Sequence, residues 1–423
     1  MTGSRAATPG SGALAEQQLL PDDRQPVIIA ARRTPVCRVN GALKTWHAHE
    51  LLAPVLRSLL ADSEAAPESV ADVVIGNAVG GGGNVARLAA LDAGLPVSVP
   101  GVTVDRQCGS GLDAIVLAAQ LVAAGGNGLY LAGGVESIST APLRARRDAR
   151  GNPQFFSRAQ FAPKGFGDPD MGVAAENVAS RFGISRERQD ALALRSHRRA
   201  LAAAAAGVFD AEIVRLDGVA GPDGVVGGDG VVGPDGGTVK ADDGPRRGLT
   251  AAVLARFPPV FAEGGTVTAG NSCFDADGAA AVVMTSVQRA RELGATDGLL
   301  VRGTDTAGVD PTLLGIGAAA AAERLLERCE VTAAGLGLVE FNEAFASQTL
   351  ACLDRLGIAP ERANLDGGAL ALGHAYGASG AVLVTRLLAQ ARRNPVEGQL
   401  ALAMISIAGG MGTAALLEYR TIS

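Results

Sequence analysis

The segment from Val102 to Ile115 constrains the fold most, because it changes from an apolar strand pattern to a helical pattern within a few residues. Cys108 lies at the turn between the two patterns, and Gly109 and Gly111 follow it. Unpaired amides and the positive end of the helix dipole stabilise a thiolate at such a turn. Glycines also let a substrate carbonyl approach the backbone. The segment therefore predicts a strand-helix unit with Cys108 as a nucleophile, and a buried structural thiol is the alternative.

Strand and helix patterns alternate along much of the remaining chain. Apolar runs predict strands over 27–31, 73–75 and 129–132, and helical spacing predicts helices over 50–60 and 85–93. The pattern is interrupted from about 139 to 266, where two helices are predicted over 174–182 and 187–206 and a glycine-rich repeat at 223–234 predicts a flexible insertion. Strand and helix alternation resumes at Val267. This order predicts a layered α/β protein.

Composition narrows the class of protein. A 48% hydrophobic share with only 4% aromatic residues and 57 glycines among 423 residues favours a closely packed globular α/β chain. The net charge of -6 argues against nucleic-acid binding. Residues 1–25 are predicted to be a flexible tail without the features of a signal peptide. No apolar run reaches the ~20 residues that a membrane span needs, so we expect no membrane association and a cytoplasmic protein.

The cysteines and one basic cluster are candidates for sites of other kinds. The five cysteines are dispersed without disulfide or metal-ligand spacing, which indicates a reducing compartment and no metal site. Residues 144–150 carry four arginines. This cluster is interpreted as solvated surface, and attraction of ligand phosphates is the alternative.

Three later segments supply groups that acyl chemistry at a cysteine needs: Asn342-Glu-Ala-Phe-Ala346, Gly367-Gly-Ala-Leu-Ala-Leu-Gly-His-Ala-Tyr-Gly-Ala-Ser-Gly380 and Ser406-Ile-Ala-Gly-Gly-Met-Gly412. Shorter matches occur at Arg33-Thr-Pro35, Gly133-Gly-Val-Glu-Ser137, Met171-Gly172, Ala175-Glu-Asn177, Thr268-Ala-Gly-Asn271 and Asp277-Gly-Ala279. In this order, from about Pro26 to the C-terminus, the motifs closely resemble those of the thiolase family of coenzyme A-dependent acyltransferases.

The resemblance implies a thiolase-like fold of two similar βαβαβ halves in a layered α/β arrangement. The N-terminal half would span 26–298, with an inserted loop domain at about 139–266, and the C-terminal half would span 299–423. A homodimer or homotetramer is implied by the same analogy.

The resemblance also implies roles for individual residues. Cys108 would attack an acyl-CoA thioester after His374 has taken its proton. Asn342 would hold a water that, with His374, stabilises an enolate oxygen, while the backbone N–H groups of Cys108 and Ala408 would form a second oxyanion site. Glu343 would orient its neighbours or act as an acid or base. Coenzyme A thioesters would be substrates, with no tightly bound cofactor.

Ser406 is the main departure, because many thiolases carry a cysteine there that exchanges the α-proton of the second thioester. A serine hydroxyl supplies almost no anionic base near neutral pH. Three alternatives would replace the missing base. His374 or Glu343 could remove the α-proton, or decarboxylation of a malonyl-type thioester could generate the carbon nucleophile without any base. In the third alternative, the acyl acceptor is something other than a thioester enolate. In the segment 271–277, which also departs from the family, Cys273 is interpreted as a packing residue, and Phe274 either as an ordinary core aromatic or as a side chain narrowing the substrate channel.

Three functional hypotheses follow. The leading one is an acyl-CoA acyltransferase that forms an acyl-cysteine and catalyses Claisen-type carbon-carbon condensation. The second is a decarboxylative condensing enzyme or an acyltransferase to a non-CoA acceptor. The third is a catalytically silent thiolase-fold scaffold subunit, which Ser406 favours and the joint presence of Cys108, Asn342 and His374 disfavours.

Overall fold

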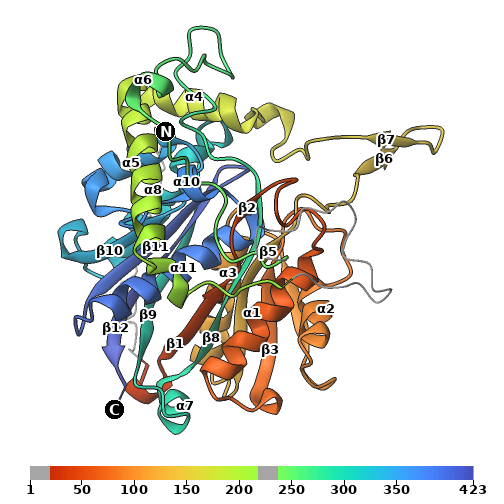
Figure 1. Ribbon diagram of the computed structural model, residues 1–423, viewed down its shortest axis with the longest axis vertical. Helices are drawn as coiled ribbons and strands as arrows, with labels where there is room; N and C mark the ends of the chain where they lie inside the picture. The colour runs from red at the N-terminus through yellow and green to blue at the C-terminus, as the bar shows by residue number, and fades with distance from the viewer. Residues whose placement is uncertain (1–19, 218–236, 423) are drawn as a thin grey trace, which may run out of the picture.

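The computed structural model describes residues 20–217 and 237–422 (Figure 1). Residues 1–19 of the predicted tail and the whole glycine-rich repeat at 223–234 lie outside the described residues. The last tail residues include a short 3-10 turn, Asp22–Arg24. Among the described helices, none is both long and apolar enough to cross a membrane.

One mixed sheet runs through the described part of the chain and contains ten strands. Its order is β10-β11-β12-β9-β1-β8-β5-β3-β4, with β2 paired to β8. Parallel pairs lie toward the two ends (β3 with β4 and β5, β10 with β11), and the central pairs are antiparallel. The strands are β1 (Pro26–Arg33), β2 (Cys37–Arg38), β3 (Val70–Gly76), β4 (Gly101–Val104), β5 (Leu129–Glu136), β8 (Ala276–Ser286), β9 (Asp297–Gly308), β10 (Leu336–Phe341), β11 (Leu400–Ile407) and β12 (Met411–Thr421).

The two halves of the chain repeat one order of elements. The first half runs β1, α1 (Ala48–Asp62), β3, α2 (Val85–Asp92), β4, α3 (Ser110–Ala123), β5 and β8. The second runs β9, α8 (Gly317–Arg328), β10, α9 (Ala346–Leu356), α11 (Tyr376–Arg393), β11 and β12. The counterpart of β4 is a single parallel bridge between Val339 and Ala363. By this order α3 and α11 are equivalent helices.

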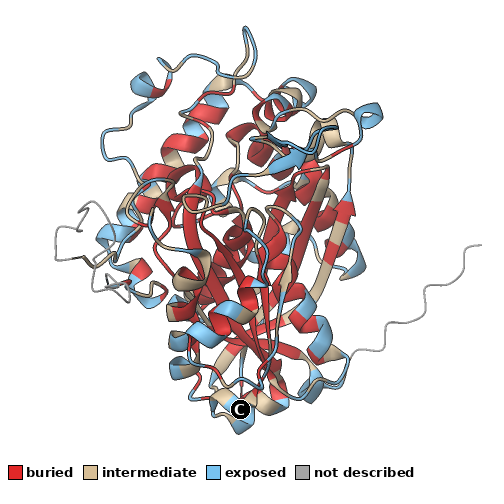
Figure 2. Cartoon of the chain, turned by 90° about the vertical axis from the view of Figure 1, so that its right-hand side faces the viewer, coloured by how far each residue is buried: buried red, intermediate tan, exposed pale blue. Residues whose placement is uncertain are grey.

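Side-chain alternation along the strands sorts the helices into layers. On β11, Ala401, Ala403 and Ile405 belong to the apolar cluster that contains α3 and α11, whereas Leu402 and Met404 belong to the cluster that contains α8 and α9. Helices α1 and α2 cover the outer face of the first half. Helices α3 and α11 therefore lie between the two halves of the sheet, where Figure 2 shows most of the chain as buried.

The segment between β5 and β8 forms the insertion. It contains β6 (Ala145–Arg147), β7 (Pro153–Phe155), α4 (Met171–Phe182), α5 (Arg186–Ala205) and α6 (Ala251–Leu254), and α7 (Val287–Glu292) follows β8. Helices α4 and α5 confirm the two helices predicted there. The regular strand pattern resumes at Ala276, later than the predicted Val267, because residues 268–271 form a turn in which Asn271 accepts from the amide of Thr268 at 2.8 Å.

Candidate active site

Cys108 lies in a tight turn between β4 and α3. Gln107 adopts a left-handed φ of 49°, and its amide donates to the carboxylate of Asp105 at 2.7 Å. The hydroxyl of Ser110 donates to the carbonyl of Gln107 at 2.6 Å and accepts from the amide of Arg106 at 2.8 Å. These bonds fix the turn, so Cys108, a partly exposed residue, is held at the start of α3.

Glycines bring the start of α3 against the start of α11. A Cβ atom on Gly111 would lie 2.5 Å from the carbonyl oxygen of Gly377, and one on Gly380 would lie 2.4 Å from the amide nitrogen of Leu112. Real Cβ atoms do not approach backbone atoms so closely. The glycines of the two motifs thus permit the contact that places the Cys108 turn beside the turn that carries His374.

Burial raises the pKa of the Cys108 thiol to about 11, although the amides of Ala408 and of Cys108 itself lower it. The charges of Glu136 and Asp275 raise this pKa further. The amides at the helix terminus therefore do not offset the loss of solvation at the Cys108 thiol. At neutral pH the thiol needs a base. The same two amides, as donors directed at the sulfur, also lie where the second oxyanion site was predicted.

His374 is only 3% exposed, and burial lowers its pKa to about 4. The hydroxyl of Ser379 donates to the carbonyl of Ala375 at 3.1 Å, so its oxygen accepts the Nδ1 proton of His374 at 2.6 Å. The buried Nε2 of His374 has no hydrogen-bond partner in residues 20–217 and 237–422. This tautomer leaves a lone pair on Nε2, which is the requirement for a neutral base.

Asn342 directly follows β10, at the same end of the sheet as the 403–407 segment of β11. It is 2% exposed, and its backbone carbonyl accepts from Nε2 of Gln348 at 3.1 Å. Its side-chain nitrogen Nδ2 is buried without a partner among the described residues. Unsatisfied buried donors are uncommon and often mark a water or ligand position.

The carboxylate of Glu343 is fully engaged. It accepts from the hydroxyl of Ser196 on α5 at 2.7 Å, from Nδ2 of Asn364 at 2.7 Å and from the amide of Leu370 at 3.3 Å. Leu370 belongs to α10 (Ala369–Leu372), the helix that leads to His374. Burial raises the pKa of Glu343, and these bonds oppose the rise. Its contacts join the insertion and α10 to the loop after β10.

Ser406 is engaged on the outer side of the sheet. Its hydroxyl donates to the carbonyl of Gly315 at 2.7 Å and accepts from the amide of Ala318, at the start of α8, at 3.2 Å. Its strand neighbours Ile405 and Ile407 pack instead into the central cluster, against which Cys108 also packs. No hydrogen bond joins Ser406 to Cys108 within the described residues.

Glu136 is a site residue that the sequence reasoning missed. It ends β5, is completely buried, and accepts from the amides of Ala78 at 2.9 Å and Gly377 at 2.9 Å. Burial raises its pKa to about 7. It therefore ties the start of α11 to the first half of the sheet. The available signal was an acidic residue at the end of an apolar strand, two positions after Gly134.

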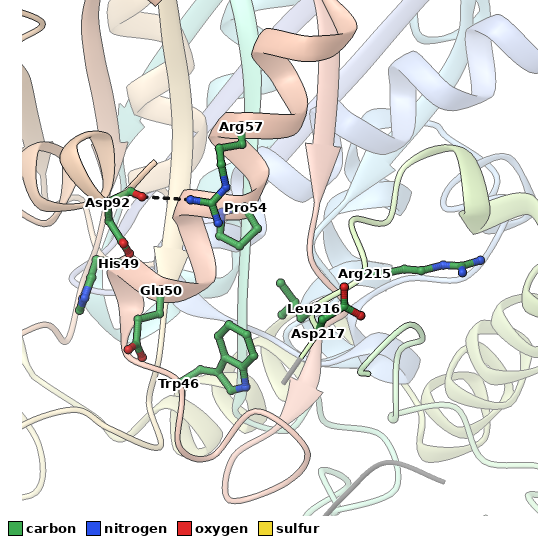
Figure 3. Close-up of a pocket in the computed structure, with 9 residues that line it drawn as sticks. All are labelled: Trp46, His49, Glu50, Pro54, Arg57, Asp92, Arg215, Leu216 and Asp217. Atoms are coloured by element: carbon green, nitrogen blue, oxygen red, sulfur yellow. Dashed lines mark hydrogen bonds between the residues drawn. The ribbon is translucent and has the colours of Figure 1, made fainter. Parts of the chain in front are cut away.

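Two further surface features lie apart from these residues. The predicted basic cluster falls on the β6–β7 hairpin, where residues 144–150 are mostly exposed. A cavity of about 340 Å³ lies beside α1, and Figure 3 shows the guanidinium of Arg57 in its lining donating to the backbone carbonyl of Asp92 at 3.0 Å. None of the predicted site residues lines this cavity.

Comparison with known proteins identifies the family to which the chain belongs. The family described as "Thiolase, N-terminal domain" matches residues 26–288, and "Thiolase, C-terminal domain" matches residues 298–419. Proteins described as "Putative acetyl-CoA C-acetyltransferase" are similar over 93% of this chain: VraB of Staphylococcus haemolyticus is 42% identical with 99% of its length covered, and YhfS of Bacillus subtilis is 42% identical with 98% covered. The crystal structure of the Bacillus anthracis acetyl-CoA acetyltransferase has a TM-score of 0.85 at 34% identity, covering 93% of this chain and 98% of that one.

The chain therefore belongs to the thiolase family, as its sequence predicted, and it has the layered α/β fold of that family. As a thiolase it is an acyltransferase.

Proposed function

We propose that this protein takes an acyl group from a coenzyme A thioester onto Cys108 and uses the acyl-cysteine in Claisen-type carbon-carbon condensation or in its reversal. The observation that carries the proposal is a pair of buried nitrogens without partners among the described residues, Nε2 of His374 and Nδ2 of Asn342. The loops that carry them both pair with one segment, through bridges of Ser272 with Phe345 and of Asp275 with His374. The backbone amides of Ala408 and Cys108 act on the Cys108 thiol and lower its pKa. These are the parts that acyl transfer through a cysteine requires.

In the loading step, Nε2 of His374 takes the proton of Cys108, and the resulting thiolate attacks the thioester carbonyl. The backbone N–H groups of Cys108 and Ala408 donate to the oxyanion that forms. Collapse of this intermediate breaks the bond to the sulfur of coenzyme A and leaves the acyl group on Cys108. Because one thioester replaces another, the acyl group remains reactive.

In the condensation step, a second thioester gives up an α-proton, which balances the proton that the departed coenzyme A thiolate takes up, and its enolate carbon attacks the acyl-cysteine. The protonated Nε2 of His374 and a water bound to Nδ2 of Asn342 stabilise the enolate oxygen. Cys108 then departs as a thiolate and regains its proton from His374. The neutral resting state of both Cys108 and His374 is compatible with this cycle, since each group changes charge only when substrate is present.

Glu343 and Ser406 take supporting roles in this scheme. The three donors to Glu343 favour the orienting role over the acid-base role, because both carboxylate oxygens are already occupied. The two hydrogen bonds of Ser406 likewise favour a structural role, since its hydroxyl holds the start of α8.

Several finer assignments belong to the same proposal. The descriptions of the relatives favour acetyl-CoA as an acyl donor. Coenzyme A enters only as part of the substrate, and no tightly bound cofactor is invoked. We retain 26–298 and 299–423 as the domain limits, with a cytoplasmic homodimer or homotetramer as the assembly.

The test is mass spectrometry of the purified protein after incubation with acetyl-CoA, with and without malonyl-CoA, beside a Cys108→Ala control. We expect an acetyl adduct on Cys108 and a condensed product. Product only with malonyl-CoA would identify the decarboxylative route. Absence of any adduct with acyl chains of several lengths would refute the proposal in favour of a silent scaffold.

A further inference from the structure

The segment from Asn271 to Ala276 lies between the loops that carry Asn342 and His374. The amide of Cys273 donates to the carbonyl of Ala344 at 2.9 Å, and Ser272 forms a bridge with Phe345. On the other side, the amide of His374 donates to the carbonyl of Phe274 at 2.9 Å. Cys273 is therefore fixed by backbone bonds between the two loops that hold the unpartnered nitrogens.

The charge of Cys108 also acts on Cys273. Phe274 and Cys108 pack against the same central cluster. Burial and then the charges of Asp275 and Cys108 raise the pKa of the Cys273 thiol well above its ordinary value. The phenol of Tyr376 donates to Asp275. Burial, the charge of Asp275 and the charges of the two thiols raise the pKa of this phenol. Cys108 and Cys273 both remain partly exposed, whereas Cys37 and Cys352 are buried.

Ser406 leaves the acid-base role for the α-carbon unfilled. Its hydroxyl is committed to Gly315 and Ala318 in the outer layer. The carboxylate of Glu343 is similarly occupied. His374 is already required for Cys108 and for the enolate oxygen. A second group that exchanges protons is needed in the space between the two loops.

We infer that Cys273 is the acid-base residue that removes and returns the α-proton of the second thioester, in place of a thiol at position 406. This inference rests on the proposed function and completes its proton transfers. The packing role that the sequence suggested for Cys273 gives way to a role in the reaction.

The steps balance as follows. As Cys108 becomes acylated, its proton passes to His374, and the departing coenzyme A sulfur takes the proton of Cys273. The Cys273 thiolate then removes the α-proton of the second thioester and becomes a neutral thiol again. The enolate carbon bonds to the acyl carbonyl carbon, the bond to the Cys108 sulfur breaks, and Cys108 takes back the proton from His374. A poorly solvated thiolate is a strong base, which suits removal of a weakly acidic C–H proton.

The experiment compares Cys273→Ala, Cys273→Ser and the wild type, with Cys329→Ser as a matched control. Cys329 is likewise a partly exposed thiol, but it follows α8 and lies outside the site. Two readouts are taken on each protein: acylation of Cys108 by acetyl-CoA, and deuterium uptake at the α-carbon of acetyl-CoA in D₂O, both by mass spectrometry.

We expect both Cys273 variants to retain Cys108 acylation within about tenfold, because a thiolate leaves without full protonation. Their α-carbon exchange should fall by about 10²–10⁴-fold, the usual contribution of a positioned acid-base group. Cys329→Ser should match the wild type in both readouts. The serine variant keeps the shape of the side chain and serves if the alanine variant folds poorly.

Exchange within tenfold of the wild type in either Cys273 variant would overturn the inference, and recovery in the serine variant alone would show a packing role. Wild-type protein that acylates Cys108 without any exchange would also overturn it, in favour of decarboxylation. Lack of acylation in the wild type would instead refute the proposed function itself, so the two failures are distinguishable.

Discussion

Alkylation of Cys108 over a range of pH tests the protonation states at the centre of the site. With a pKa of about 11, about one Cys108 in 10⁴ is a thiolate at pH 7. The pKa of His374 is about 4, so separating a proton from Cys108 onto His374 costs roughly 10 kcal/mol before the two charges attract each other. The free enzyme therefore holds a neutral thiol and a neutral imidazole.

Iodoacetamide reacts with the thiolate only, so its rate reports this equilibrium. We expect the rate of Cys108 alkylation, followed by intact-protein mass spectrometry, to rise about tenfold per pH unit between pH 7 and pH 10. His374→Ala should leave this profile unchanged, because the imidazole is already neutral there. A plateau below pH 8 that disappears in His374→Ala would refute the reasoning, since it would demonstrate a resting thiolate-imidazolium pair.

Three other perturbations follow from particular contacts. Gly380→Ala should lower the free energy of unfolding by about 1–3 kcal/mol in denaturant titrations, since its Cβ would lie 2.4 Å from the amide nitrogen of Leu112, whereas the open position Gly248 should tolerate alanine. Ser406→Ala should cost about 1–3 kcal/mol through its two lost hydrogen bonds, and α-carbon exchange per folded molecule should not change. The pKa of Glu136 rises from 4.5 to about 7 on folding, so its contribution to the free energy of unfolding is greatest below pH 4.5 and is lost as the pH rises to 7. Glu136→Gln should remove about 3 kcal/mol of this dependence of unfolding free energy on pH. If the unfolding free energy of the variant falls with pH as steeply as that of the wild type, the burial argument is contradicted.

The elements that local patterns define were predictable from the sequence. Apolar runs and helical spacing located β1, β3, α2, α4 and α5 within a few residues of their observed limits. The turn at Cys108 was also found, since its glycines and apolar flanks are neighbours in the chain. The family motifs then predicted the layered arrangement, which the comparisons support.

Features that depend on distant contacts were not predictable. The hydroxyl of Ser196 donates to Glu343, which lies 147 residues later in the sequence. No local sequence pattern predicts that bond. Burial in the folded chain raises the pKa of Cys108 more than the nearby backbone amides lower it. The sequence shows the helix terminus but not this burial. The position of Cys273 follows from backbone pairing with residues about 70 and 100 positions later, so its identity as a site residue emerges only from the folded chain.

The two halves repeat one order of elements, but the residues that precede their equivalent helices have different proposed roles in the reaction. Cys108, the proposed nucleophile, precedes α3, and His374, the proposed base, precedes α11, although these helices correspond in the two halves. Each half thus supplies one of the two groups in the proposed proton transfer: the first half supplies the thiol, and the second supplies the imidazole. Two helices in equivalent positions are therefore preceded by different reactive side chains, a thiol and an imidazole. By this proposal neither half alone holds both groups of the proton transfer, so the reaction takes place only where the two halves pack together.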